Sequence, residues 1–422
     1  MLVIARFSTP SSSAVPALPG ATNTFCTRAP GNAGTALEDG VENLAITSIP
    51  ELLAFAQKED IHFTVVGPEA PLAAGVVDAF RAAGQKIFGP TQAAAQLESS
   101  KDFAKAFMLR HHIPTASYQT FSDVTAAREY VEKHGAPIVI KADGLAAGKG
   151  VVVAMTVQEA HDAINMMLAD NKLGDAGARV VIEEFLQGEE ASFIVMVDGK
   201  HVLPLATSQD HKRLLDGDHG PNTGGMGAYS PAHVVTPELH ARVLREVIQQ
   251  VVQGMEKEGN AYTGFLYAGL MIDAHGNYKV LEFNCRMGDP ETQPIMLRLK
   301  SDLSVLMEHG VDGTLDKVNV EWDRRAALGV VLAAANYPDT PRTGDVINGL
   351  PKKLEDAHIF HAGTAMRDGQ VVTNGGRVLC VTALGDSVKM AQRHAYQAAE
   401  SIHFDGCQMR RDIGYHALST RK

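Results

Sequence analysis

The stretch "IHFTVVGPEAPLAAGVVDAFRAAGQKIFGPT", residues 61–91, decides the predicted fold of the N-terminal part of the chain. A short β-branched run leads through a Gly-Pro turn into an amphipathic helical pattern, and a second short apolar run follows. Strands that alternate with helices in this way are typical of βαβ units in a parallel sheet. We therefore predict an N-terminal open parallel-sheet domain and place it at residues 1–97.

The pattern changes in "PIVIKADGLAAGKGVVVAM", residues 137–155, where a glycine-rich loop joins two apolar runs. Such a pair is typical of an antiparallel hairpin. We predict a second domain over residues 98–320 with a hairpin-rich lid at about 114–187, followed by a small α+β domain over residues 321–422. The chain is thus predicted to be a multidomain α/β and α+β protein.

Composition excludes several classes of function. The 422 residues carry 38 Lys and Arg against 49 Asp and Glu, a formal net charge of −11, and no basic run stands out. A nucleic-acid or anionic-membrane surface is therefore not expected. No apolar stretch is long enough to span a bilayer. The start of the sequence lacks basic residues followed by a sustained apolar segment, as in a signal peptide, so we expect a cytoplasmic protein. The four cysteines are scattered, without the spacing of a disulfide framework or a zinc site.

Charged and polar residues gather in "KVLEFNCRMGDPETQP", residues 279–294, which begins as a strand. Residues two apart on a strand share a face, so Glu282 and Asn284 point the same way. Two hard oxygen donors side by side suit Mg²⁺. The alternative is a strand that runs into a polar turn, with Arg286 paired to Asp289 or Glu291 for stability alone.

A second polar segment, "DGLAAGKGV" at residues 143–151, suits a phosphate, because glycines let backbone N–H groups approach an anion and Lys149 adds charge. It is not a Walker A loop, since only three residues separate Gly144 from Gly148 and a glycine follows the lysine. The loop joins two strands, which favours a hairpin flap over a nucleotide. A mobile surface hairpin is the competing interpretation.

Two lysines outside that loop are further candidates for anion binding. Lys141 lies on an apolar strand, where an ammonium needs an anion or a carboxylate. Lys101 stands at a helix start, where the helix dipole favours a nearby phosphate. Carboxylates that suit ribose hydroxyls or an amino group surround a strand end further on: Glu183, Glu184, Glu189 and Glu190. Solvated surface lysines and a solvated acidic turn are the alternatives.

The segment "TSQDHKRLLDGDHGPNTGGMGAYSP", residues 207–231, is long, polar and rich in glycine, without helical or strand periodicity. Loops of this length in compact proteins are usually functional or disordered. Lys212 and the glycines at 224, 225 and 227 fit a loop that covers a substrate. An irregular surface connection is the other interpretation.

Taken together, these segments resemble the ATP-grasp superfamily and, within it, the glycinamide ribonucleotide synthetase family. The resemblance runs from about Ala29 to the C-terminus. It rests on these blocks in this order: "APGNAGT", "VGPEAPL", "IFGPT", "IKADGLAAGKGV", "IEEFLQGEEASF", "TSQDHKR", "GPNTGGMGAYSP" and "RMGDPETQP". Glu-x-Asn at a strand end is weak evidence alone, whereas the full order of blocks is specific.

The resemblance implies a reaction and its ligands. It implies ATP- and Mg²⁺-dependent ligation of glycine to 5-phosphoribosylamine through a glycyl phosphate, which gives glycinamide ribonucleotide, ADP and phosphate in purine biosynthesis. Mn²⁺ is the alternative metal. The implied partners are these small molecules, with no nucleic acid and no membrane, and the protein is expected to be a monomer.

The resemblance also implies roles for individual residues. The implied metal ligands are Glu282 and Asn284. The implied catalytic residues are Arg286, Asp289 and Lys212. The residues implied to hold ATP are Lys101, Lys141, Gly148, Lys149, Glu183, Glu184, Leu186 and Glu190, with adenine contacted largely through the backbone of 183–186 and the ribose by Glu190. The residues implied to hold glycine or phosphoribosylamine are Gly31, Asn32, Glu69, Pro71, Asp210, Gly225 and Glu291.

One span departs from the family pattern. The family's first strand leads into a G-x-G-G-R-E-H-A turn and helix, whereas residues 1–28 read "MLVIARFSTPSSSAVPALPGATNTFCTR". We expect residues 5–7 to take the place of that turn, and residues from about 6 to 27 to be irregular. The alternative function is therefore an ATP-binding protein with impaired or no synthetase activity. A related ATP-grasp carboxylase is a third possibility, which "RMGDPETQP" disfavours.

Overall fold

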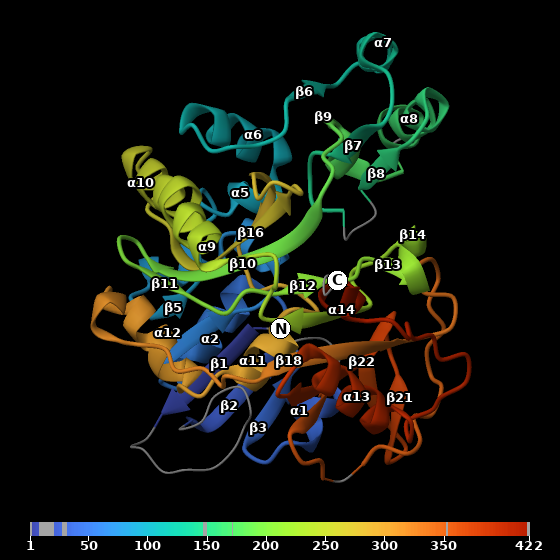
Figure 1. Ribbon diagram of the computed structural model, residues 1–422. Helices are drawn as coiled ribbons and strands as arrows, with labels where there is room; N and C mark the ends of the chain where they lie inside the picture. The colour runs from blue at the N-terminus through green and yellow to red at the C-terminus, as the bar shows by residue number, and fades with distance from the viewer. Residues whose placement is uncertain are drawn as a thin grey trace.

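The computed structural model describes residues 2–7, 21–27, 32–146, 150–170, 172–351 and 353–419. Figure 1 shows a lid, built around strands β6 to β9, that stands away from the rest of the molecule at the top of the view. The N-terminal and C-terminal parts lie together below it. No helix in these ranges is long and apolar enough to cross a membrane.

The N-terminal sheet is open and carries helices, which confirms the predicted α/β class. Its strand order is β3-β2-β1-β4-β5. The strands are β1 (Leu2–Phe7), β2 (Ala21–Thr27), β3 (Val41–Leu44), β4 (Phe63–Val66) and β5 (Ile87–Phe88). The helices are α1 (Ala33–Leu37), α2 (Ile49–Lys58), α3 (Glu69–Ala73) and α4 (Val76–Ala82). Strands β2 and β3 pair in parallel, as do β4 and β5.

Strand β1 differs from the expectation, because it runs antiparallel to both of its neighbours. Leu2 pairs with Val66 and Ala5 with Phe63, so the chain leaves β1 at the sheet edge opposite to the one where β4 ends. The expectation that residues 5–7 take the place of the family's first turn is wrong, because all three lie within strand β1. So is the expected irregular chain for residues 6–7 and 21–27, which are strand; residues 8–20 lie outside the described ranges.

The lid contains the predicted antiparallel hairpin. Its sheet order is β6-β9-β7-β8, with every pair antiparallel. The strands are β6 (Tyr118–Phe121), β7 (Ile138–Ala142), β8 (Val151–Ala154) and β9 (Val180–Glu184), and the helices are α7 (Val124–His134) and α8 (Val157–Ile164). Buried apolar side chains from both helices and from β7 and β9 form a core of the lid's own, which includes Val131, Ile140, Ile164 and Ile182.

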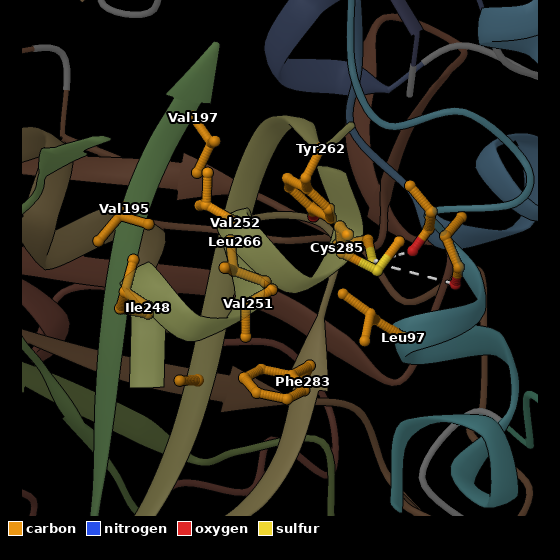
Figure 2. Packing of buried hydrophobic residues seen from close by; sticks show 14 of the residues in the cluster. Leu97, Val195, Val197, Ile248, Val251, Val252, Tyr262, Leu266, Phe283 and Cys285 are labelled. Atoms are coloured by element: carbon orange, nitrogen blue, oxygen red, sulfur yellow. Dashed lines mark hydrogen bonds between the residues drawn. The ribbon is translucent and has the colours of Figure 1, made fainter. Parts of the chain in front are cut away.

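A second antiparallel sheet, of order β11-β10-β16-β17, lies below the lid. Its strands are β10 (Glu189–Asp198), β11 (Val202–Pro204), β16 (Thr263–Ile272) and β17 (Tyr278–Asn284). Helices α5 (Gln96–Ser99), α6 (Lys101–Arg110), α9 (Pro237–Val243) and α10 (Gln249–Lys257) accompany it. Figure 2 shows Val251 and Val252 of α10 against Val195, Val197 and Leu266 of the sheet. Helix α10 thereby covers one face of this sheet.

The C-terminal part is built on a five-stranded sheet of order β12-β15-β18-β22-β19. Its strands are β12 (Gln209–Asp210), β15 (Gly227–Ser230), β18 (Ala326–Ala333), β19 (Ala357–His361) and β22 (Arg377–Gly385). The helices are α11 (Thr292–Arg298), α12 (Leu303–Val311), α13 (Val388–Ala399) and α14 (Tyr415–Ser419), and two small hairpins complete it: β13 (Arg213–Leu215) with β14 (His219–Asn222), and β20 (Thr364–Arg367) with β21 (Gln370–Thr373).

Four of these short strands come from the segment 207–231, which was expected to lack strand structure. Its ends pair with the C-terminal sheet: Gln209 with Tyr229, and Tyr229 in turn with Leu328. Both ends of the segment are thus fixed in the C-terminal sheet, and its polar middle lies between these two anchored ends. The domain boundaries placed at 97, 320 and around the lid stay predictions.

Candidate active site

A buried carboxylate between two lysines lies where the lid meets the strands below it. Glu183 on β9 is 2% exposed, and its Oε2 lies 2.9 Å from Lys105 Nζ while its Oε1 lies 3.0 Å from Lys141 Nζ. Lys105 also donates to Thr115 Oγ1 at 2.8 Å. Burial lowers the pKa of Lys105 to about 8, against the opposing effect of Glu183. One negative charge here meets two positive ones, so a positive charge is left over for a ligand.

Lys101 extends this positive region from the start of α6. Its Nζ donates to the carbonyl of Gly144 at 3.2 Å, at the root of the β7–β8 loop. Ser100 caps the helix by accepting from the N–H of Phe103 at 3.1 Å, and its hydroxyl donates to Asp143 Oδ1 at 3.0 Å. Burial lowers the pKa of Lys101, while the Glu282 carboxylate opposes the shift. The helix start and the loop are thus tied together.

Glu282 and Asn284 share one face of β17, as predicted from the strand period. They pair with Gly269 and Tyr267 of β16. Burial alone would raise the pKa of Glu282, but the ammonium groups of Lys212, Lys141 and Lys101 and the Arg286 guanidinium hold it below its usual value. The carboxylate is therefore ionised at neutral pH.

The segment 209–212 brings two further predicted residues to the same place. Lys212 forms an ion pair with Glu190 at the start of β10. Burial alone would lower the pKa of Lys212, but Glu190 and Asp210 raise it well above its usual value. Burial raises the pKa of Asp210 to about 7, and the Glu291 and Glu190 carboxylates add to the shift, against the opposing charge of Lys212. Asp210 can therefore change its charge near neutral pH.

Arg286 joins the site to the N-terminal sheet. Its Nε donates to Glu69 Oε2 at 3.1 Å, at the start of α3, and its Nη2 lies 3.1 Å from Glu98 Oε1. Glu98 is buried, and its Oε2 accepts from the N–H of Cys285 at 2.7 Å. Burial raises the pKa of Glu98 to about 7, against the opposing effect of Arg286. Figure 2 shows Cys285 beside Leu97 of α5, which fixes this corner.

The two acids after Arg286 have different surroundings. Glu291 is buried, and its Oε1 accepts from Ser192 Oγ at 2.8 Å and from Tyr267 OH at 3.1 Å. Asp289 is exposed and its Oδ2 lies 2.9 Å from Nη2 of Arg377, which comes from the C-terminal sheet. Glu291 is thus held inside the site, whereas Asp289 is held at its rim.

The other predicted residues are less tightly grouped. Glu184 points away from its neighbour Glu183, with an ion pair to Lys279 and a bond from the N–H of Ser117 at 3.0 Å. Leu186 lies in the linker between β9 and β10. Pro71 lies in α3, two residues after Glu69. Gly31, Gly148 and Lys149 lie outside the described residues.

Asn32 and Gly225 have structural partners. The Asn32 amide donates to the carbonyl of Ala362 at 2.5 Å, and its oxygen accepts from the N–H of Gly34 at 2.8 Å, at the start of α1. It therefore joins the N-terminal sheet to the C-terminal part. Gly225 has φ of +119°, and a Cβ there would come 2.4 Å from Pro290 Cδ.

Sequence reasoning missed several residues that hold the site together. Lys105 lies one helical turn after Lys101, a spacing that places both on one face of α6. Glu98 lies in the short helix α5, just before Lys101, and its burial has no sequence signal of its own. Ser192, Tyr267 and Arg377 come from strands whose alternation predicts only which face they occupy.

The sequence matches the profiles of three domains in order. Residues 19–98 match the phosphoribosylglycinamide synthetase N domain, residues 99–292 its ATP-grasp (A) domain and residues 327–416 its C domain. The phosphoribosylamine–glycine ligase of Ralstonia nicotianae is 70% identical over 390 residues, which are 92% of this chain and 92% of that protein. The phosphoribosylamine–glycine ligase of Escherichia coli K12 is 65% identical over 394 residues, again 92% of each chain.

Solved structures agree with these matches. The crystal structure of phosphoribosylamine–glycine ligase from Thermotoga maritima superimposes with a TM-score of 0.72 at 41% identity, over 78% of this chain and 82% of that one. A biotin carboxylase from Campylobacter jejuni gives a TM-score of 0.71 at 15% identity, over 94% of this chain and 89% of that one, and so shares the fold. The chain, with its three domains and its lid over a lysine-rich site, belongs to the phosphoribosylglycinamide synthetase family of ATP-grasp proteins.

Proposed function

We propose that this protein uses ATP to join glycine to 5-phosphoribosylamine. The names of its relatives indicate that they join these two substrates. The observation that carries the proposal is the group of four cations, Lys101, Lys141, Lys212 and Arg286, that lowers the pKa of one carboxylate, Glu282. Three of these cations also pair with other carboxylates, Lys141 with Glu183, Lys212 with Glu190 and Arg286 with Glu69. Four cations gathered at one place suit a transferring phosphoryl group.

The reaction explains why no nucleophilic side chain is required. A glycine carboxylate is a poor electrophile, so its oxygen first attacks the γ-phosphorus of ATP, and the bond to ADP breaks. The amine of phosphoribosylamine then attacks the carbonyl carbon of the glycyl phosphate; phosphate leaves and the amine loses a proton. Catalysis of phosphoryl transfer rests on positioning and charge neutralisation. Closure of the lid would exclude water and so protect the acyl phosphate from hydrolysis.

The nucleotide is proposed to lie between the lid and the sheet below it. Lys101 and Lys141 would contact its phosphates, and the linker after Glu183 would contact adenine through its backbone. Gly148 and Lys149, which lie outside the described residues, are proposed as further phosphate contacts. Glu190 would hold the ribose. Because Glu190 is paired with Lys212 in this structure, nucleotide binding would exchange that partner for a ribose hydroxyl and free the lysine for the glycine end of the site.

Glu282 and Asn284 fit a magnesium site. Among the described residues, none donates a hydrogen bond to the Glu282 carboxylate or to the Asn284 amide oxygen, so both acceptors are available. The Glu282 carboxylate is ionised, and a carboxylate beside an amide oxygen is a hard donor set that suits Mg²⁺ and accepts Mn²⁺. When bound, the metal supplies neutralisation of phosphate charge. The two residues would leave its remaining positions to phosphate oxygens and water.

The glycine end is proposed to lie among Arg286, Asp210, Lys212 and Glu291. Arg286 would face the carboxylate or acyl phosphate and Glu291 the amino group. Phosphoribosylamine would approach from the N-terminal sheet, where Glu69 and Pro71 lie in α3, after β4, and Asn32 caps α1. Gly31, which lies outside the described residues, is proposed to act with them. We further propose that the protein is a cytoplasmic monomer.

The competing function, ATP binding with impaired synthesis, has an observation in its favour. The profile of the N domain matches only from residue 19, and the chain leaves β1 away from the edge where β4 ends. An open α/β sheet binds its ligand at the carboxyl ends of its parallel strands. Phosphoribosylamine would therefore lose contacts that ATP never makes.

Glycine labelled with oxygen-18 in its carboxylate tests the proposed route. Attack of that oxygen on ATP carries one labelled oxygen into inorganic phosphate, which mass spectrometry detects. Labelled phosphate that appears only with ATP and phosphoribosylamine present supports the proposal. Product without label in phosphate rejects the glycyl phosphate, and tight ATP binding without product favours the competing function.

A further inference from the structure

Arg377 opens β22, and its guanidinium reaches from the C-terminal sheet to two loops of the candidate site. Nη1 donates to the carbonyl oxygens of Gly224 and Asp289, both at 2.7 Å, and Nη2 donates to Asp289 Oδ2 at 2.9 Å. Only 21% of the Arg377 side chain is exposed. A planar fork that serves several acceptors in fixed directions is a geometry that arginine provides and lysine does not.

Glycine at two positions makes room for this contact. A Cβ on Gly224 would come 2.8 Å from Arg377 Cζ, and one on Gly225 would come 2.4 Å from Pro290 Cδ. The N–H of Gly224 also donates to Tyr337 OH at 2.9 Å, so the C-terminal part holds Gly224 through its N–H and its carbonyl. The loop around Gly224 is therefore pressed against the loop around Pro290, with the guanidinium joining them.

Both loops are joined to residues of the site, the first by hydrogen bonds and the second along the chain. Thr223 donates from its N–H and its Oγ1 to the carbonyl of Lys212, at 2.7 and 2.9 Å. Asp289 stands two residues before Glu291, which is held inside the site. Arg377 therefore connects, through one side chain, the segment that carries Lys212 and the segment that carries Glu291.

We propose that Arg377 is a positioning residue for the glycine end of the site. It aligns the Lys212 ammonium and the Glu291 carboxylate by fixing the loops that carry them, and it does not touch the reacting atoms. The identity of the substrate rests on the proposed function; the coupling of the loops does not. Lys101 and Lys141 lie on α6 and β7, outside these contacts, so binding of ATP should be spared.

Kinetics of Arg377→Lys and Arg377→Met, with glycine and ATP varied separately, test this role. Loss of charge-assisted hydrogen bonds should lower kcat/KM for glycine by about tenfold or more in the lysine variant, and further in the methionine variant. The KM for ATP should change little. Arg393→Met, at an exposed position on α13, should match the unchanged protein. Equal losses toward glycine and ATP, or full activity in Arg377→Met, would overturn the proposal.

Hydrogen exchange supplies a readout that does not depend on turnover. In both Arg377 variants the amides of residues 219–226 should exchange faster, while those of 138–142 in the lid should not change. Unaltered exchange at 219–226 would refute the coupling. Absence of glycine-dependent turnover in the unchanged protein would instead reject the proposed function, and the exchange result would still decide the role of Arg377. If Arg377→Met fails to fold, Arg377→Lys still tests the proposal, because it keeps the positive charge and removes only the fork of hydrogen bonds.

Discussion

Lys105 and Lys141 lie 2.9 and 3.0 Å from the two oxygens of one buried carboxylate, Glu183. Lys105 comes from α6 and Lys141 from the lid strand β7, so the carboxylate links the lid to the part below it. Because Lys105 alone can balance the negative charge of Glu183, the charge of Lys141 is not fully neutralised by this carboxylate. Lys141 is thereby left with positive charge to offer a phosphate.

Glu183→Gln should destabilise the fold. The change keeps the shape of the side chain but leaves two buried ammonium groups without their counter-charge, and breaking a buried pair typically costs about 3–5 kcal/mol. We expect the free energy of unfolding in urea to fall by about 3 kcal/mol at neutral pH. Glu184→Gln is the matched control, because it removes a partly exposed pair with Lys279 worth about 1 kcal/mol or less. Equal losses would show that Glu183 has no special role.

Glu98 should make stability depend on pH. Its carboxyl has a pKa of about 7 in the folded protein, against about 4.3 for an unfolded glutamate. Between these values the folded state binds more protons than the unfolded state, so the contribution of Glu98 to stability falls as pH rises from about 4.3 to about 7. Glu98→Gln removes this dependence. The stability of the variant relative to the unchanged protein should therefore rise across that window; a constant difference would contradict the assignment.

Glu282→Gln should abolish activity without unfolding the protein. The amide keeps the shape but removes the charge proposed for the magnesium site, and losses of about a hundredfold or more are expected when such an interaction is removed. The free energy of unfolding in urea should fall by less than in Glu183→Gln, since Glu282 is not part of an apolar core and the cations around it keep other carboxylate partners. Glu256→Gln, at an exposed position on α10, is the control. Normal turnover of Glu282→Gln at saturating Mg²⁺ would show that the residue is structural.

Replacing residues 1–28 by a strand, a G-x-G-G-R-E-H-A turn and a helix should raise ligase activity. Such a turn would place backbone N–H groups at the carboxyl edge of the sheet, where they can meet the phosphate of phosphoribosylamine. The KM for phosphoribosylamine should fall, and the Kd for ATP, measured by calorimetry, should stay the same. If the unchanged protein already turns over as fast, this span does not limit the reaction.

Strand alternation and glycine spacing predicted the elements that depend on local pattern. The β7–β8 hairpin and the shared face of Glu282 and Asn284 follow from the period of a strand, and the structure has both. The direction of β1 could not be predicted in this way, because it depends on the path of the chain between strands. A short β-branched run fits a parallel or an antiparallel neighbour equally well.

The partners of charged residues were harder to predict. Lys101 and Lys141 each stand out in the sequence as unusual cations in their own surroundings, whereas Lys105 looks like an ordinary helix residue until Glu183 packs against it. Arg377 carries no local signal at all, since its acceptors are backbone carbonyls of distant loops. The family resemblance implies that Glu190 holds the ribose, and only the fold reveals that Glu190 pairs with Lys212.

Omission of each substrate in turn tests the central claim most directly. ADP formation and the mass of the product would be measured with ATP and Mg²⁺, with glycine or phosphoribosylamine left out. We predict ADP release that requires both, together with a product whose mass equals that of glycine plus phosphoribosylamine less one water. ADP release that is independent of glycine, or ATP binding without any ligated product, would contradict the account.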